Sequence, residues 1–272
     1  MTKKRKIILI VVIALVVLCI AGLAFAGNYF FDFALKSRRG ERAPGVPQSE
    51  EVEGTSERTE SAQHAYTWLE ESAEEIGISS HDDLALHGYF VPQEGNRYAV
   101  IVHGYTGNAR SMAGFGHALY ERGFNILLPD CRGHGDSEGS YIGMGWPDRL
   151  DVLSWVDWII QKDPDAEILL YGISMGGATV MMVSGEKLPP QVKLIIEDCG
   201  YSSVWDEFSV QLNEQFGRPT FPLMNVTSLV TKLRAGYWFG EADAVKQVAK
   251  STVPMLFIHG EDDTFVPFWM LE

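Results

Sequence analysis

The residues with the clearest chemical pattern lie between Gly172 and Gly176, where the sequence reads Gly-Ile-Ser-Met-Gly. The apolar run at residues 168–171 predicts a buried strand before this segment, and residues 178–182 can begin a helix after it. A serine in a sharp turn between strand and helix has a strained backbone, and flanking glycines let the two elements approach each other. The pattern therefore predicts that the hydroxyl of Ser174 is pushed out of the turn as a nucleophile.

Other polar loops also follow predicted strands. These loops are His103-Gly104-Tyr105-Thr106-Gly107, Asp130 followed by Arg132-Gly133-His134-Gly135, and His259-Gly260 followed by Asp263 and Val266-Pro267. Because parallel strands end at the same edge of a sheet, we expect these loops to gather around Ser174.

The elements that must position these loops alternate along the chain. Strands are predicted at residues 84–91, 97–102, 124–128, 168–171, 193–197 and 254–259, and helices at 61–76, 111–122 and 146–161. This alternation predicts an α/β fold, with a mostly parallel sheet and helices on both faces.

Residues 199–250 interrupt the alternation with helical stretches that are rich in aromatic residues. An insertion between two strands would lie over the strand ends, so we expect a small helical cap with an apolar underside. Ordinary helices packed on the sheet are the alternative interpretation.

The N-terminus has the composition of a membrane anchor. A basic cluster at residues 3–6 precedes residues 7–26, which are twenty residues without a charge. At about 1.5 Å per residue, such a helix spans the hydrocarbon core, and the basic cluster should stay cytoplasmic. We therefore expect an anchor at residues 1–35, a polar linker at 36–60 and an extracytoplasmic domain at 61–272. A signal peptide cleaved after Ala24-Phe25-Ala26 is the alternative.

The overall composition limits the partners of the chain. The chain has 272 residues, and its net charge of −14 argues against nucleic-acid binding, which requires a basic surface. No residue spacing indicates a zinc site, and no Gly-x-Gly-x-x-Gly segment follows a predicted strand. We therefore expect no metal and no organic cofactor.

Together, these motifs resemble the α/β-hydrolase superfamily, in family order from about residue 85 onward. The set is similar to exported or membrane-anchored bacterial hydrolases of the serine aminopeptidase S33-like group, which are often described as lysophospholipase- or esterase-like. The resemblance implies that Ser174 is the nucleophile and that the backbone N–H groups of Tyr105 and Met175 form the oxyanion hole. It also implies that Asp263 is the acid that orients the catalytic histidine, with Asp198 as the alternative acid.

The catalytic histidine is the departure from this pattern. The expected order is serine, acid and histidine, but none of the nine residues after Asp263 is a histidine. We therefore expect the sequence to be truncated, without the last strand, helix and histidine of the fold. His103 and His134 are the alternative bases, because their loops face the same edge of the sheet.

Two functions follow from these expectations. The first is a membrane-bound serine hydrolase that cleaves carboxylic esters, or amides and peptides, through an acyl-enzyme on Ser174. The aromatic residues of the predicted cap favour a small-molecule substrate with a hydrophobic group. The second is a non-catalytic binding protein, or an inactive fragment, with an α/β-hydrolase fold and no base.

Overall fold

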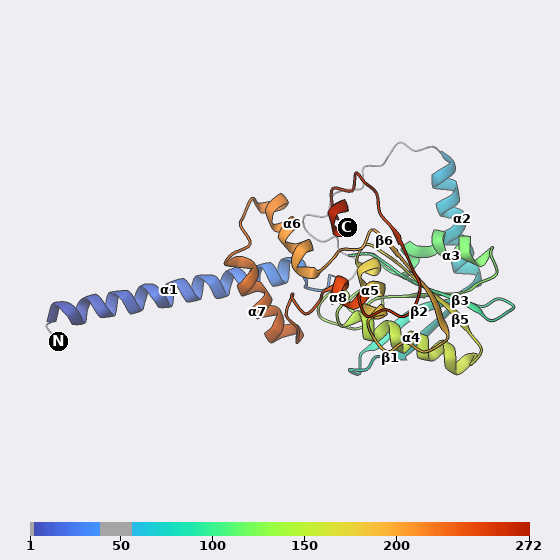
Figure 1. The fold of residues 1–272 in the computed structure, drawn as a ribbon, viewed down its shortest axis with the longest axis horizontal. Coiled ribbons are helices and arrows are strands. Elements are labelled where there is room, and N and C mark those ends of the chain that lie inside the picture. Colours follow the sequence, from blue (N-terminus) through green and yellow to red (C-terminus); the bar gives the residue numbers. More distant parts are fainter. Residues whose placement is uncertain (1–2, 39–55) are drawn as a thin grey trace.

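The computed structural model describes residues 3–38 and 56–272, which are built around a seven-stranded sheet (Figure 1). The strands are β1 (Glu74–Ser79), β2 (Ala85–Val91), β3 (Arg97–Val102), β4 (Asn125–Pro129), β5 (Glu167–Ile173), β6 (Val192–Asp198) and β7 (Met255–Ile258). Their order across the sheet is β1-β2-β4-β3-β5-β6-β7. Strands β3 to β7 pair in parallel, whereas β1 and β2 are antiparallel. The predicted mostly parallel sheet is confirmed.

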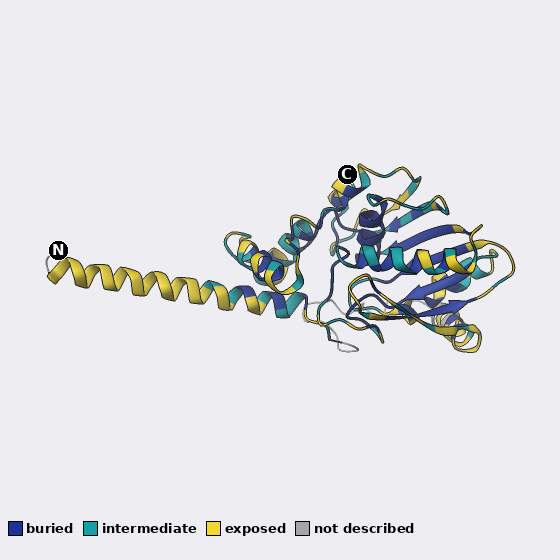
Figure 2. Cartoon of the chain, turned by 90° about the horizontal axis from the view of Figure 1, so that it is seen from below, coloured by how far each residue is buried: buried dark blue, intermediate teal, exposed yellow. Residues whose placement is uncertain are grey.

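Helices cover both faces of this sheet, because its central strands are apolar on both sides. In β3, Ala99 and Ile101 pack with the side chains of α2 (Ser56–Ser72), whereas Val100 and Val102 belong to the core on the opposite face. On the first face lie α2, the short 3-10 helix η1 (Ala109–Met112) and α3 (Ala113–Tyr120). On the opposite face lie α4 (Asp148–Lys162) and α5 (Met175–Ser184). Figure 2 shows the buried sheet between these layers.

The first predicted helix, at residues 61–76, is wrong at both ends. Its apolar face is confirmed, since Ala65 and Leu69 of α2 are buried. The helix begins earlier, however, and ends at Ser72. Ile76 lies instead in β1 and pairs with Gly88 of β2. Pairing with a strand further along the chain decided this conformation, and the local pattern could not show it.

Three helices lie between β6 and β7, in the region predicted as a helical cap. They are α6 (Val204–Phe216), α7 (Leu223–Ala235) and α8 (Ala244–Val248). The hydroxyl of Ser203 accepts a hydrogen bond from the N–H of Asp206 and caps the start of α6, and Gly217 ends this helix in a left-handed conformation (φ 58°). Helices α6 and α7 lie beside the end of the first helix in Figure 1, whereas α8 packs on α5. A last 3-10 helix, η2 (Phe268–Met270), follows β7.

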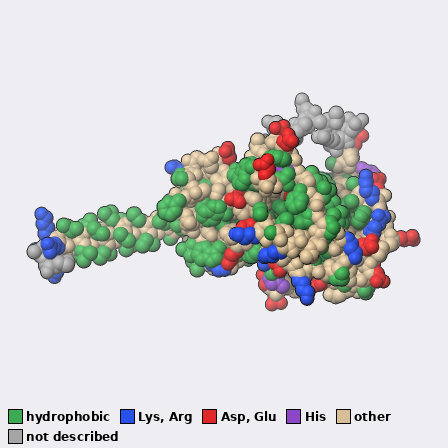
Figure 3. All heavy atoms as spheres, in the orientation of Figure 1, with side chains coloured by type: hydrophobic (Ala, Val, Ile, Leu, Met, Phe, Trp, Pro, Cys, Tyr) green, Lys and Arg blue, Asp and Glu red, His purple; other side chains and the backbone are tan. Residues whose placement is uncertain are grey.

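The first helix, α1 (Lys3–Ala34), projects away from the sheet as a long apolar rod (Figures 1 and 3). Nearly all of its side chains between residues 3 and 26 are exposed (Figure 2). Its last turns are packed on α7, where Gly27 and Phe31 are buried. The length and apolar composition of α1 are sufficient to cross a membrane, as predicted from residues 7–26.

The chain directly after α1 is attached to the sheet domain. The carbonyl of Leu35 accepts the N–H of Ile142 at 2.6 Å, and the N–H of Ser37 donates to Ser140 O at 3.1 Å. Residues 39–55, most of the predicted linker at 36–60, lie outside the described residues. The end of α1 is therefore joined both to α7 and to the loop that follows β4.

Candidate active site

Ser174 occupies a tight turn between β5 and α5, as the sequence predicts. Its backbone has φ 56° and ψ −118°, a strained conformation for a residue with a side chain. Its N–H donates to Asp198 O at 2.7 Å. A Cβ on Gly172 would lie 2.1 Å from Gly176 O, and a Cβ on Gly176 would lie 2.1 Å from Val102 O. Both positions of the motif therefore require glycine.

The two N–H groups assigned to the oxyanion hole lie on segments that flank Ser174. Met175 is the first residue of α5, and the N–H groups of a first turn have no acceptor within their helix. Gly104 passes beside the serine, since a Cβ on this glycine would lie 3.3 Å from the Ser174 Cβ. Tyr105 follows Gly104, and its N–H donates to no backbone carbonyl within residues 3–38 and 56–272.

The side chain of Tyr105 connects this loop to the first helix. Its hydroxyl donates a hydrogen bond to Ala34 O at 2.6 Å, at the end of α1. Burial raises the pKa of the Tyr105 phenol to about 12, so the phenol remains protonated and can donate this bond. The loop that carries a predicted oxyanion donor is therefore attached to α1.

A buried carboxylate, Asp130, holds the same loop from the other side. One of its oxygens accepts the N–H of Ala109 at 2.7 Å, and the other accepts the N–H of Asp136 at 3.1 Å. The second oxygen also lies 2.9 Å from Nδ1 of His87. Asp130 thus joins the loop after β3 to the loop after β4, and it positions the backbone beside Ser174.

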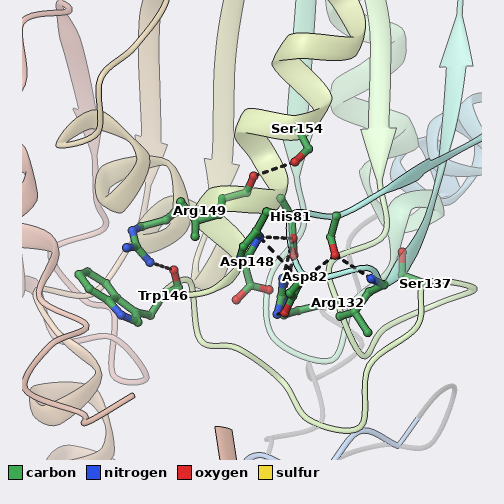
Figure 4. A network of polar contacts seen from close by, with 12 residues as sticks. His81, Asp82, Arg132, Ser137, Trp146, Asp148, Arg149 and Ser154 are labelled. Atoms are coloured by element: carbon green, nitrogen blue, oxygen red, sulfur yellow. Dashed lines mark hydrogen bonds and ion pairs between the residues drawn. The ribbon is translucent and has the colours of Figure 1, made fainter. Parts of the chain in front are cut away.

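Beneath these loops lies a network of ionic contacts (Figure 4). The buried guanidinium of Arg132 donates to both carboxylate oxygens of Asp151 at 2.7 Å and to Asp82 at 2.9 and 3.0 Å. Burial raises the pKa of the neighbouring Asp148 to about 7. These contacts fasten the loop after β4 to α4 and to the turn between β1 and β2.

Two groups of side chains in this region have the atom spacing of metal sites. They are His81 with Asp82 and Asp151, and His87 with Asp130 and Asp136. The carboxylates of Asp82 and Asp151 already bind Arg132, and Asp130 already accepts backbone N–H groups. We therefore assign no metal to either group.

Asp263, the predicted acid, lies in the loop after β7. Its Oδ1 accepts the N–H groups of Phe265 and Val266, both at 2.9 Å, which fixes the carboxylate within its loop. Burial is the main cause that raises the pKa of Cys199, and the charge of Asp263 raises it further. Cys199 follows Asp198, whose carbonyl accepts the Ser174 N–H. Asp198, the alternative acid, has its Oδ2 bound by the hydroxyl of Tyr171 at 2.8 Å.

A pocket beside Ser174 is lined mainly by apolar side chains of α1, α6 and α7. Its aromatic lining consists of Tyr105, Tyr201 and six phenylalanines, Phe30, Phe33, Phe208, Phe216, Phe239 and Phe265. Glu207 is the acidic residue of the lining, and its Oε2 is buried without a hydrogen-bond partner among the described residues. Burial raises the pKa of Glu207 to about 8. The pocket thus offers an apolar chamber with one neutral carboxyl group near neutral pH.

Comparison with known proteins agrees with this architecture. Residues 93–218 match the protein family described as Serine aminopeptidase, S33. The structure of the Pyrococcus furiosus esterase Pf2001 superposes with a TM-score of 0.57 and 22% sequence identity, covering 74% of this chain and 75% of the esterase. The chain has the α/β-hydrolase fold.

Two sequence relatives of this chain extend the comparison. The uncharacterized protein YqkD of Bacillus subtilis is 28% identical over 184 residues, which cover 67% of this chain and 60% of YqkD. The lysophosphatidylserine lipase ABHD12 of Xenopus tropicalis is 30% identical over 158 residues, which cover 55% of this chain and 38% of ABHD12. The chain thus spans less than two thirds of the length of either relative.

The buried histidines near the strand ends lie outside the pocket beside Ser174. Nε2 of His103 accepts the N–H of Cys131 at 3.0 Å, and its Nδ1 lies 2.8 Å from Gly104 O. Burial lowers the pKa of His103 to about 4 and that of His134 to about 3, so both are neutral. Nε2 of His259 lies 2.7 Å from Val266 O. Among residues 3–38 and 56–272, no histidine lines the pocket.

Sequence reasoning missed the contribution of α1 to the site. Phe30 and Phe33 belong to the segment at residues 1–35 that is predicted as an anchor, yet both line the pocket together with Ala34. It also missed Glu207, whose helix was predicted without a role for individual polar residues. Aromatic residues directly after a charge-free segment were the available signal, but only the fold shows which of them face the pocket.

Proposed function

We propose that this α/β hydrolase cleaves carboxylic esters, or amides, through an acyl-enzyme on Ser174. The observation that carries the proposal is the position of Ser174: a strained turn beside Gly104, opening into an apolar pocket. The S33 family match and the esterase with the same fold support the same class of reaction.

In this reaction, the oxygen of Ser174 forms a bond to the substrate carbonyl carbon, and the serine proton passes to a base. The negative charge on the carbonyl oxygen is stabilised by the N–H groups of Met175 and Tyr105. Collapse of this intermediate breaks the bond to the leaving alcohol or amine, which takes the proton back from the base. Water then attacks the acyl-enzyme in the same manner, releasing the acid and restoring Ser174.

The pocket favours a substrate with an apolar acyl group. Phe208 and Phe239 pack against each other at 5.0 Å between ring centroids, and both line the pocket. Burial of an acyl chain there is favourable by about 0.8 kcal/mol per methylene group. The name of the relative ABHD12, a lysophosphatidylserine lipase, supports an ester of this kind.

A non-catalytic binding protein is the second candidate function. The first candidate function needs a base beside Ser174, but none of the described histidines lines the pocket. His103 is fixed by hydrogen bonds at both ring nitrogens, of which Nε2 accepts the N–H of Cys131, so it is a poor substitute. The catalytic proposal therefore requires a base that the described residues do not place beside Ser174.

A fluorophosphonate probe tests the proposal, since it reacts only with an activated serine. We expect it to modify Ser174 in the protein isolated from its source membranes, and we expect Ser174→Ala to abolish both labelling and ester turnover. Ser154→Ala is the matched control. Ser154 lies on α4, where its hydroxyl donates a hydrogen bond to Leu150 O at 3.1 Å, within the same helix. This variant should retain full labelling.

The same measurement separates the two candidates. Labelling of Ser174 together with turnover of a butanoyl ester supports the hydrolase. Absence of labelling in correctly folded protein from the source membranes would overturn it and favour the binding protein. Labelling that persists in Ser174→Ala would place the nucleophile elsewhere.

A further inference from the structure

The end of α1 forms part of the pocket wall. Phe30, Phe33 and Ala34 all line the pocket beside Ser174. The rings of Phe30 and Phe33 meet Phe216 of α6 edge to face, each at 5.2 Å between centroids. Without α1, one side of the pocket would therefore be open.

This wall lies immediately after the part of α1 that is suited to a membrane. The strongly apolar segment at residues 7–26 ends four residues before Phe30, which is about 6 Å along the helix axis. Asp32, the first charged residue after this segment, pairs with Arg234 of α7 at 2.8 Å. The pocket wall is thus placed at the boundary between the hydrocarbon core and water.

The cap continues this apolar surface beside α1. Leu229 and Leu233 follow one another at helical spacing on α7 and are 44% and 78% exposed, and Phe221 before α7 is 74% exposed. Helix α7 packs directly on α1 (Figure 1), and hydrophobic side chains gather around this junction in Figure 3. Exposed leucines and phenylalanine beside a membrane-spanning helix are suited to contact with lipid.

We infer that the pocket binds the acyl chain of a single-chain membrane amphiphile, which enters at the membrane surface, and that the last turns of α1 are part of its binding site. The hydrolysis of such a molecule rests on the function proposed above, whereas its binding does not. The occupant is a lipid because the same two helices form part of the pocket wall and carry the exposed apolar surface. Helix α1 carries the apolar segment at residues 7–26, and α7 carries the exposed Leu229 and Leu233.

The same turn of α1 also holds the catalytic loop. Ala34 O accepts the hydrogen bond of Tyr105, whose N–H is assigned to the oxyanion hole. The acyl pocket and the predicted oxyanion donor therefore share one support. Loss of the α1 contacts should weaken the binding of long chains more than that of short ones, because a longer chain makes more apolar contacts with the pocket wall.

Binding of a photoreactive lipid to the full chain in membranes tests this inference. The probe is an ether-linked single-chain phospholipid with a dodecyl chain and a terminal diazirine, which cannot be hydrolysed. We expect crosslinks to residues 30–34 and to the pocket side chains of α6 and α7. Crosslinks confined to residues 7–25 and to the exposed face of α7 would overturn the inference.

Matched phenylalanine variants make the test quantitative. Phe30→Ala and Phe33→Ala should each weaken binding of the dodecyl probe by about tenfold, because each removes apolar contacts with the chain. Phe25→Ala is the control, since Phe25 lies on the same helix and is 76% exposed. The inference fails if Phe25→Ala weakens binding as much as the pocket variants, or if none of the three changes it.

A pocket-filling variant still tests the inference if the alanine substitutions disrupt the packing of α1 on α6. Ala34→Leu adds volume at the wall, and it should reduce dodecyl binding. Unchanged dodecyl binding in Ala34→Leu counts against the inference. Failure of the proposed function looks different: fluorophosphonate labelling and butanoyl turnover are then absent, whereas lipid crosslinking in the pocket persists.

Discussion

At the scale of single residues, the buried carboxyl of Glu207 makes stability depend on pH. Burial raises its pKa from 4.5 to about 8, and the charge of Asp263 acts in the same direction. Because the folded protein holds this proton to a higher pH than the unfolded chain, Glu207 lowers stability progressively as pH rises from 4.5 towards about 8. We expect Glu207→Gln to be more stable than the wild type at about pH 9, by a few kcal/mol at most.

The measurement is thermal unfolding of both proteins between about pH 5 and about pH 9. Gln211 donates to Oε1 of Glu207 at 3.1 Å, and a glutamine at position 207 can still accept this bond. Glu214→Gln is the control, because Glu214 lies exposed on the same helix. A difference between Glu207→Gln and wild type that stays constant with pH contradicts the prediction, as does an equal effect of Glu214→Gln.

Single residues were also where the sequence was most informative. The turn around Ser174 was predictable because its glycines are required locally, by clashes within a few residues. Asp263 was located by its place after the last strand, and its role as the catalytic acid stays a prediction. The Ala34–Tyr105 hydrogen bond joins positions far apart in the chain, and no local pattern encodes it.

At the scale of elements, the contact of α1 with α7 depends on one glycine. A Cβ on Gly27 would lie 2.7 Å from Cγ1 of Val226 and 3.1 Å from its carbonyl oxygen. Gly27→Leu therefore forces the two helices apart, and we expect it to destabilise their packing by about 1–3 kcal/mol. Hydrogen exchange of the α7 backbone amides in membranes should become correspondingly faster.

Gly22→Leu provides the comparison for this element. Gly22 lies on the same helix, and a Cβ there meets nothing within 4 Å. The change should leave exchange in α7 unaffected. Faster exchange in both variants would mean that a leucine anywhere in α1 disturbs the helix, and no effect in Gly27→Leu would mean that α1 and α7 separate readily.

The elements also show where sequence patterns stop being sufficient. Strand β3 was predicted with its observed bounds, because a continuous apolar run is typical of a strand buried on both faces. The helix α8 lies in the region predicted as a cap, but it packs on α5 in the sheet layer. Helices of a cap and helices packed on the sheet are both amphipathic, so the sequence pattern alone cannot tell which surface a helix covers.

At the scale of the whole molecule, the charge of −14 limits the ways in which the chain can bind a membrane. An acidic domain gains no attraction from anionic lipids, so the hydrophobic contacts of α1 and α7 must supply the binding energy. We propose that α1 is retained as an uncleaved anchor, with the basic residues 3–6 in the cytoplasm and the hydrolase domain outside.

We expect the native protein to resist alkaline carbonate extraction, and its N-terminal peptide to contain residues 1–26. Protease that can reach only the outer face of the cytoplasmic membrane should digest the domain but leave residues 3–6 intact. A mature N-terminus at Gly27 would establish the signal-peptide alternative and refute the anchor. The pocket wall at residues 30–34 would then remain in the mature protein, but the charge-free segment that aligns it with the membrane would be lost. We would then expect the protein to bind the dodecyl probe equally well in detergent solution and in membranes.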